Sequence, residues 1–120
     1  MNDVESTKTE IITDKRGFNV FAKIKSKKVM ISYTKKGYYR GGDYHNVPQL
    51  FMVLKGSVIY RIKEHGKERN MVLKAGQSYI APRRCPHIIK AREDTIFIEA
   101  FLGKDTTTFY YDDYRKLVKK

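Results

Sequence analysis

Short runs of apolar or alternating residues, each long enough for a β-strand, follow one another along most of this 120-residue chain. Gly, Pro and charged clusters separate them, and nine Tyr, six Phe and recurrent Val and Ile suit strands better than helices. The predicted strands are residues 18–24, 28–34, 43–55, 57–63, 67–73, 78–81, 87–91 and 95–102. A two-sheet barrel or sandwich needs about this number of strands, so we predict a single all-β domain.

The two ends of the chain differ from its middle. Residues 1–10 are polar and are predicted to form a flexible tail, residues 11–110 the barrel, and residues 111–120 a C-terminal helix. The helical segment begins with acidic residues and ends with basic ones, which suits the helix dipole. A helix this short should form only if Tyr114, Leu117 and Val118 pack on the barrel.

The chain is strongly basic, with 25 Lys and Arg against 13 Asp and Glu and a net charge of +12. The basic residues occur in scattered pairs, which favours a solvated surface, so nucleic acid is the less favoured partner. Cys85 is the only cysteine, the N-terminus is polar, and no apolar stretch is long enough to cross a bilayer. We therefore expect a cytoplasmic protein without a membrane partner.

Two spaced segments contain the polar residues from which a site is predicted. Residues 37–56 have the form G-x5-D-x-H-x3-Q-x6-G, and residues 76–87 have the form G-x5-P-x4-H, which ends at His87. Residues two apart on a strand point to the same face. If His87 points into the same interior, polar groups converge in an apolar barrel, which is typical of a small-molecule site. Asp43 and His45 are predicted to share one face of the run 43–55, and Gln49, Phe51 and Val53 continue on that face if Pro48 does not shift the register.

These segments resemble the two signature motifs of the cupin superfamily, G-x5-H-x-H-x3,4-E-x6-G and G-x5-P-x-G-x2-H-x3-N. The resemblance implies a double-stranded β-helix, the cupin jelly-roll barrel, whose motif residues line the interior. A standard cupin metal site uses three His and one Glu at these positions. In a metal-binding cupin of the iron or manganese dioxygenase type, the residues expected to hold divalent Fe, Mn, Ni or Zn would be Asp43, His45, Gln49 and His87.

Other segments resemble the sugar 3,4-ketoisomerases, also called WxcM-like cupins, and the epimerases of nucleotide-linked deoxysugars. They are DKRGF at 14–18, RGGDYH at 40–45, YIAP at 79–82 and YDDYR at 111–115. Ketoisomerases carry Gln at the position of Gln49 and need no metal, so the favoured interpretation is an isomerase without a cofactor. The resemblance implies migration of a carbonyl, through an enediol, on a nucleoside-diphosphate 4-keto-6-deoxysugar.

The same resemblance implies roles for individual residues. His45 is the expected base or proton shuttle, and Asp43 orients a neighbouring imidazole or takes part in acid–base chemistry itself. The second proton carrier is expected among His87, Tyr33 and Tyr79. The nucleotide sugar is expected to contact Arg40, Gln49, Phe51 and Arg61, with its diphosphate on Arg40.

Two alternatives stand beside the isomerase. One is the metal-binding cupin described above, and the other is a non-catalytic ligand-binding or regulatory cupin. A homodimer is expected in each case, because cupins of this size often pair and the free edges of the sheets provide a physical reason.

Overall fold

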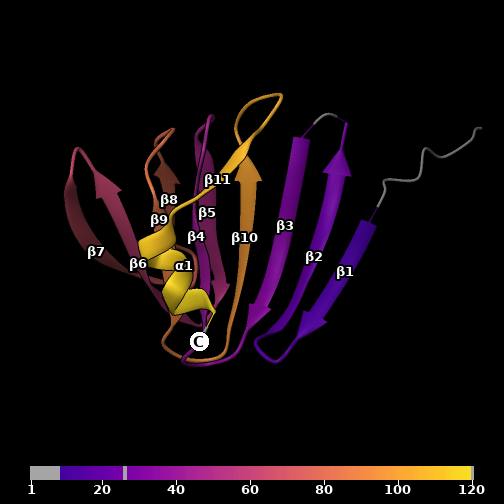
Figure 1. Ribbon diagram of the computed structural model, residues 1–120. Coiled ribbons are helices and arrows are strands. Elements are labelled where there is room, and N and C mark those ends of the chain that lie inside the picture. The colour runs from indigo at the N-terminus through magenta and orange to yellow at the C-terminus, as the bar shows by residue number, and fades with distance from the viewer. Residues whose placement is uncertain (1–8, 26, 120) are drawn as a thin grey trace, which may run out of the picture.

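The computed structural model, which describes residues 9–25 and 27–119, shows two antiparallel sheets that form a barrel (Figure 1). The six-stranded sheet contains, in order, β1 (Thr9–Asp14), β2 (Gly17–Ile24), β3 (Lys27–Thr34), β10 (Thr95–Phe101), β5 (Gln49–Lys55) and β8 (Ser78–Ala81). The five-stranded sheet contains β11 (Thr108–Tyr110), β4 (Tyr39–His45), β9 (His87–Ala91), β6 (Ser57–Glu64) and β7 (Lys67–Lys74). The predicted all-β, two-sheet architecture is confirmed.

The predicted single strand over residues 43–55 is wrong. The structure divides it into β4, which ends at His45, and β5, which begins at Gln49 in the other sheet. Pro48, which has no N–H to donate, lies in the turn between them, and its carbonyl accepts a hydrogen bond from the Leu102 N–H. His45 and Gln49 therefore reach the interior from opposite sheets rather than along one strand.

The sequence pattern does not predict the edge strands β1 and β11. Every residue of both strands is exposed, so neither strand alternates between buried and exposed positions. Strand β1 begins at Thr9, before the predicted start of the barrel, and residues 1–8 of the predicted tail lie outside the described residues. Strands β1 and β2 extend the six-stranded sheet to one side of the barrel, on the right in Figure 1.

Aromatic and branched side chains from both sheets fill most of the interior. The Phe51 ring lies between those of Tyr60 and Phe97, with centroid separations of 5.1 and 4.8 Å. Val53 and Ile62 are fully buried in the same cluster. Because each such side chain contributes about 1.5–3 kcal/mol on burial, this cluster stabilises the barrel around a smaller group of polar interior residues.

The C-terminal helix α1 (Asp112–Val118) lies on the outer face of the five-stranded sheet (Figure 1). Tyr114 and Val118 are buried against Ile88, and Leu117 is partly buried beside them, as predicted. No helix within the described ranges is long and apolar enough to span a membrane.

Candidate metal centre

A bulge in β4 directs polar side chains into the barrel. In the register with β9, Arg40 lies opposite Ile89 and Asp43 lies opposite His87, so β4 has one more residue than β9 over this stretch. The glycines at 41 and 42 accommodate the extra residue, because their φ angles of +96° and +80° lie in the left-handed region. Arg40 and Asp43 consequently face the same interior, although this spacing would place them on opposite faces of a regular strand.

Asp43, His45 and His87 form a close cluster in this interior. Asp43 Oδ1 lies 3.5 Å from His45 Nε2 and 3.4 Å from His87 Nε2. One oxygen or nitrogen atom from each of the three residues lies within 4.8 Å of the other two. The histidine side chains are 4% and 5% exposed, and that of Asp43 is 21% exposed. The structure thus brings together three of the residues predicted at the motif positions.

The Nδ1 atom of each imidazole, which points away from Asp43, interacts with a neighbouring group. His87 Nδ1 donates to the Cys85 carbonyl at 3.1 Å, and His45 Nδ1 lies 3.0 Å from Thr108 Oγ1. Because a carbonyl can only accept, the proton of neutral His87 lies on Nδ1, which leaves a lone pair on Nε2. Burial lowers the pKa of His87, although the Asp43 charge opposes this, so the neutral form is favoured.

The cluster has the donor atoms of a metal site. Among the described residues, both histidine Nε2 atoms are buried without a hydrogen-bond partner. The Asp43 carboxylate and the His87 Nε2 lone pair are both acceptors, so they repel unless a proton or a cation lies between them. Two His and one carboxylate form the ligand set of many non-haem iron(II) sites, and contacts at Nδ1 orient such ligands. These residues therefore fit a divalent metal ion.

Aromatic rings enclose the histidines. The Phe101 ring packs edge-on against His45 with a centroid separation of 4.6 Å, and the Tyr60 ring stacks on His87 at 5.8 Å. The Tyr60 hydroxyl is buried with no hydrogen-bond partner within residues 9–25 and 27–119, and burial raises the pKa of Tyr60 well above its ordinary value. Tyr60 therefore remains a protonated phenol beside the cluster.

Glu99 on β10 is a second interior carboxylate that the sequence analysis did not single out. Burial, and to a lesser extent the Asp43 charge, raise the pKa of Glu99 to about 8, although the Arg40 charge opposes the rise. A signal was present in the sequence, because strand alternation places Glu99 on the same face as the buried Phe97. A charged residue at a core position of a strand indicates a site.

Arg40 is buried, with one edge of its guanidinium left free. Its Nε donates to Thr34 Oγ1 at 3.0 Å, and Nη1 lies 3.5 Å from the Asp14 carboxylate. Arg40 Nη2 is buried and has no hydrogen-bond partner among the residues that the structure describes. Arg40 is therefore an interior cation that Thr34 and Asp14 hold in place, and its Nη2 group remains available to donate a hydrogen bond.

Of the two predicted substrate-binding residues on β5, only Gln49 lies near the cluster of Asp43, His45 and His87. Gln49 lies opposite Phe101, the residue that contacts His45. Gln49 Oε1 is buried, and no described residue forms a hydrogen bond with it. Phe51 is 1% exposed and belongs to the apolar core. Gln49 thus lies near the cluster, whereas Phe51 packs within the core.

The structure does not place the two predicted tyrosines at the cluster. Tyr33 alternates with buried residues of β3, and its hydroxyl donates to Asp94 at 3.2 Å. The Tyr79 hydroxyl accepts a hydrogen bond from Arg69 at 2.8 Å. The Tyr79 ring contacts the Tyr60 ring at 5.3 Å, and it is the Tyr60 ring that stacks on His87.

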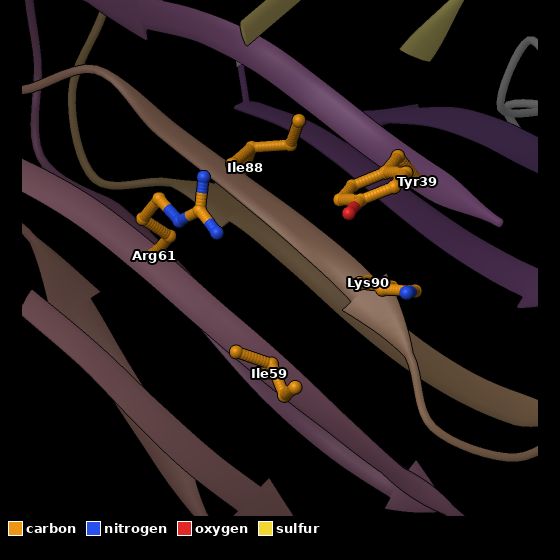
Figure 2. Close-up of a pocket in the computed structure, with 5 residues that line it drawn as sticks. All are labelled: Tyr39, Ile59, Arg61, Ile88 and Lys90. Carbon is orange, nitrogen blue, oxygen red and sulfur yellow. The ribbon is translucent and has the colours of Figure 1, made fainter. Parts of the chain in front are cut away.

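Arg61 points to the outer face of the five-stranded sheet, where Arg61 Nε donates to Asn70 at 3.2 Å. The residues on either side of it, Tyr60 and Ile62, are buried in the core. A cavity of about 160 Å³ lies on this outer face, and Figure 2 shows the side chains that line it. The cavity and the metal cluster therefore lie on opposite sides of the sheet. The residues that line the cavity are Tyr39, Ile59, Arg61, Ile88 and Lys90.

Solved structures share this fold. A deletion mutant of Bacillus subtilis oxalate decarboxylase has a TM-score of 0.79 and 19% identity, over 96% of this chain and 34% of that chain. Another oxalate decarboxylase structure, from a study of that enzyme's Mn(II) centers, has a TM-score of 0.78 and 18% identity, over 92% of this chain and 33% of that chain. Identity this low shows the fold alone, which is the cupin fold predicted from the two motifs.

Curated relatives are similar in sequence over shorter stretches. The Homo sapiens 3-hydroxyanthranilate 3,4-dioxygenase is 36% identical over 47 residues, which are 38% of this chain and 16% of that protein. The Danio rerio 3-hydroxyanthranilate 3,4-dioxygenase is 28% identical over 76 residues, which are 58% of this chain and 26% of that protein. The chain thus spans about a quarter or less of the relatives that it matches.

The family comparison covers most of the chain. The model of the 3-hydroxyanthranilic acid dioxygenase family matches residues 19–116. The comparisons support the predicted cupin superfamily but not the sugar ketoisomerase type. The chain belongs to the 3-hydroxyanthranilic acid dioxygenase family of cupins.

Proposed function

We propose that this protein is a metal-dependent dioxygenase that acts on a small aromatic acid, with Asp43, His45 and His87 as the metal ligands. The observation that carries the proposal is the convergence of two buried, unpaired Nε2 atoms on one carboxylate oxygen. Membership of a dioxygenase family supports the reaction class. The metal-binding alternative of the sequence analysis is thus favoured over the isomerase.

The protein residues have separate tasks in this proposal. When bound, iron(II) in a two-His, one-carboxylate site supplies open coordination positions for oxygen chemistry. Cys85 and Thr108 orient the imidazoles through their Nδ1 atoms. Gln49 offers a buried Oε1 atom near the cluster as a weaker, neutral donor.

Two further residues face the same interior and suit an aromatic acid. The free Nη2 of Arg40 is a buried donor that suits the carboxylate of such a substrate through a charge-assisted hydrogen bond. Glu99, with a pKa of about 8, is able to give or take a proton near neutral pH. A hydroxylated aromatic acid would use both groups, since its carboxylate needs a cation and its ring hydroxyl needs a proton acceptor.

Oxygen uptake tests this proposal. Protein loaded with Fe(II) under anaerobic conditions is mixed with 3-hydroxyanthranilate and oxygen, and we expect oxygen consumption with loss of the aromatic absorption. The His87→Ala variant should lose activity beyond the ~10–100-fold that residues supporting a metal ligand typically cost. His65→Asn is the matched control, because exposed His65 lies in a turn with φ +54°, a conformation that Asn tolerates.

Two outcomes would contradict the proposal. One is the absence of oxygen uptake by protein shown to contain iron, with 3-hydroxyanthranilate and with a panel of related aminophenol and catechol acids. The other is metal-independent conversion of a nucleoside-diphosphate keto sugar by the same protein, which would restore the isomerase.

A further inference from the structure

The cavity of about 160 Å³ on the outer face of the five-stranded sheet is formed by three neighbouring strands, β4, β9 and β6. Directly opposite residues of an antiparallel pair lie on the same face, so the register defines rows across the sheet. In one row Lys90 lies opposite both Tyr39 and Ile59, and in the next row Ile88 lies opposite Arg61. These five side chains line the cavity, so its shape depends on the sheet and not on a loop (Figure 2).

The apolar part of this lining suits a single small ring. It consists of Ile59, Ile88 and the ring of Tyr39, and Tyr114 and Val118 of α1 pack on Ile88 from the side. An engineered apolar cavity of ~150 Å³ in another protein binds benzene, so the volume here accommodates one six-membered ring. Sites for drug-sized ligands have about 300–1,000 Å³, so a nucleotide or a peptide side chain with its backbone is too large.

Arg61 is held in place at one end of its guanidinium group. Its Nε donates to Asn70 Oδ1 at 3.2 Å and lies 3.9 Å from Glu68 Oε2. The same Glu68 oxygen accepts a hydrogen bond from the Tyr114 hydroxyl at 2.9 Å, so Arg61 shares this carboxylate. Neither Nη atom of Arg61 forms a hydrogen bond with any residue that the structure describes. Two parallel N–H donors therefore remain for a bidentate contact with a carboxylate.

Lys90 is the second cation of the cavity. Its Nζ lies 5.4 Å from the centroid of the Tyr39 ring, and within residues 9–25 and 27–119 no carboxylate oxygen lies within 4.0 Å of it. No acidic side chain lines the cavity, so two positive charges face it without a negative charge among its walls. On a chain whose net charge is +12, such a cavity attracts a small anion.

We propose that this outer cavity binds a small aromatic carboxylate. The ring packs on Ile59, Ile88 and Tyr39, and the carboxylate accepts hydrogen bonds from the terminal nitrogens of Arg61, with Lys90 as the second positive charge. The five-stranded sheet separates the cavity from the metal cluster, so a molecule bound here does not contact the metal ligands. The proposal is independent of the metal centre and of the reaction.

The test titrates the full, chelator-treated chain with benzoate and follows the isotope-labelled isoleucine methyl groups by NMR. We expect saturable shifts of the Ile59 and Ile88 methyl signals that give one dissociation constant, on the order of 1 mM for so small a ligand. Benzyl alcohol, which has the same ring without the charge, should bind at least about fivefold more weakly. Arg61→Gln and Lys90→Gln should each weaken benzoate binding by about fivefold or more, because each removes one of the two cations.

Matched controls separate the cavity from the general charge of the chain. Arg92→Gln and Lys67→Gln make the same charge changes at exposed positions outside the cavity, and both should leave benzoate binding unchanged. The remaining methyl signals show whether each variant folds. Shifts that do not saturate, equal binding of benzyl alcohol, or equal weakening by the control variants would each overturn the proposal. Saturable shifts at Ile62, which lies opposite His87 in the interior, without shifts at Ile59 and Ile88, would also overturn it and assign benzoate to the interior site.

Discussion

At the scale of single residues, the interior combines groups that an ordinary core excludes. In the part of the chain that the structure describes, buried polar atoms without a hydrogen-bond partner occur in Arg40, His45, Gln49, Tyr60 and His87. An unsatisfied buried group costs about 1–3 kcal/mol, so such a concentration indicates binding rather than stability. Asp43 and Glu99 add two carboxylates that influence each other electrostatically. A cation at the cluster would relieve the repulsion among these groups.

The raised pKa of Glu99 predicts that the stability of the metal-free protein depends on pH. Its pKa rises from 4.5 to about 8 on folding, so the folded state binds this proton more tightly than the unfolded state. The contribution of Glu99 to stability is therefore fully present below pH 4.5 and is lost as the pH rises to about 8. Glu99→Gln removes the titrating group. The free energy of unfolding of the unmodified protein should fall relative to Glu99→Gln between these pH values, by about 1–3 kcal/mol after allowance for partial exposure.

Denaturant unfolding at closely spaced pH values, with chelator present, checks this prediction. Glu93→Gln is a suitable control, because Glu93 is exposed. A difference between the unmodified protein and Glu99→Gln that stays constant with pH would show that Glu99 titrates as it does in water.

At the scale of elements, the bulge in β4 places the cluster. Gly42 has φ +80°, and a Cβ there would lie 2.9 Å from Arg115 Cδ and 3.1 Å from the Arg115 backbone nitrogen in α1. The Tyr111 N–H also donates to the Gly42 carbonyl at 2.9 Å. The helix therefore packs directly on the bulge that sets the direction of Asp43.

Gly42→Ala should destabilise the protein by about 1–3 kcal/mol through backbone strain and collision with α1. It should also weaken metal binding, because relief of the collision moves β4 and Asp43. Gly66→Ala is the matched control: Gly66 has φ +76°, but nothing lies within 4 Å of its added Cβ. Thermal unfolding and metal titration of both variants provide the measurement. Equal destabilisation by the two variants would show that contact between helix and bulge is unimportant.

The sequence pattern predicts some strands and site residues of this fold and not others. Short apolar or alternating runs, bounded by Gly, Pro and charged turn residues, predict β6 through β10 to within a residue or so. The pattern is absent in exposed β1 and β11, whose existence depends on pairing with β2 and β4. Spacing alone predicts Asp43, His45 and His87, but the division at Pro48 and the glycine bulge depend on which sheet each strand joins.

At the scale of the whole molecule, the two sheets have different outer faces. The five-stranded sheet is partly covered by α1, whereas the six-stranded sheet presents an uncharged apolar row to solvent. The interior between them holds the polar cluster beside an aromatic core. The polar cluster therefore lies inside the barrel, and the six-stranded sheet separates it from the outer apolar row.

The central claim is that Asp43, His45 and His87 bind one divalent metal ion. Calorimetric titration of the chelator-treated protein with Mn(II) or, without oxygen, Fe(II) tests it most directly. We predict one ion per chain, with stabilisation of about 2.7 kcal/mol at a free metal concentration of 100 Kd. Binding should be lost in His87→Ala and Asp43→Asn and kept in His65→Asn. The absence of stoichiometric binding, or equal loss in His65→Asn, would contradict the account.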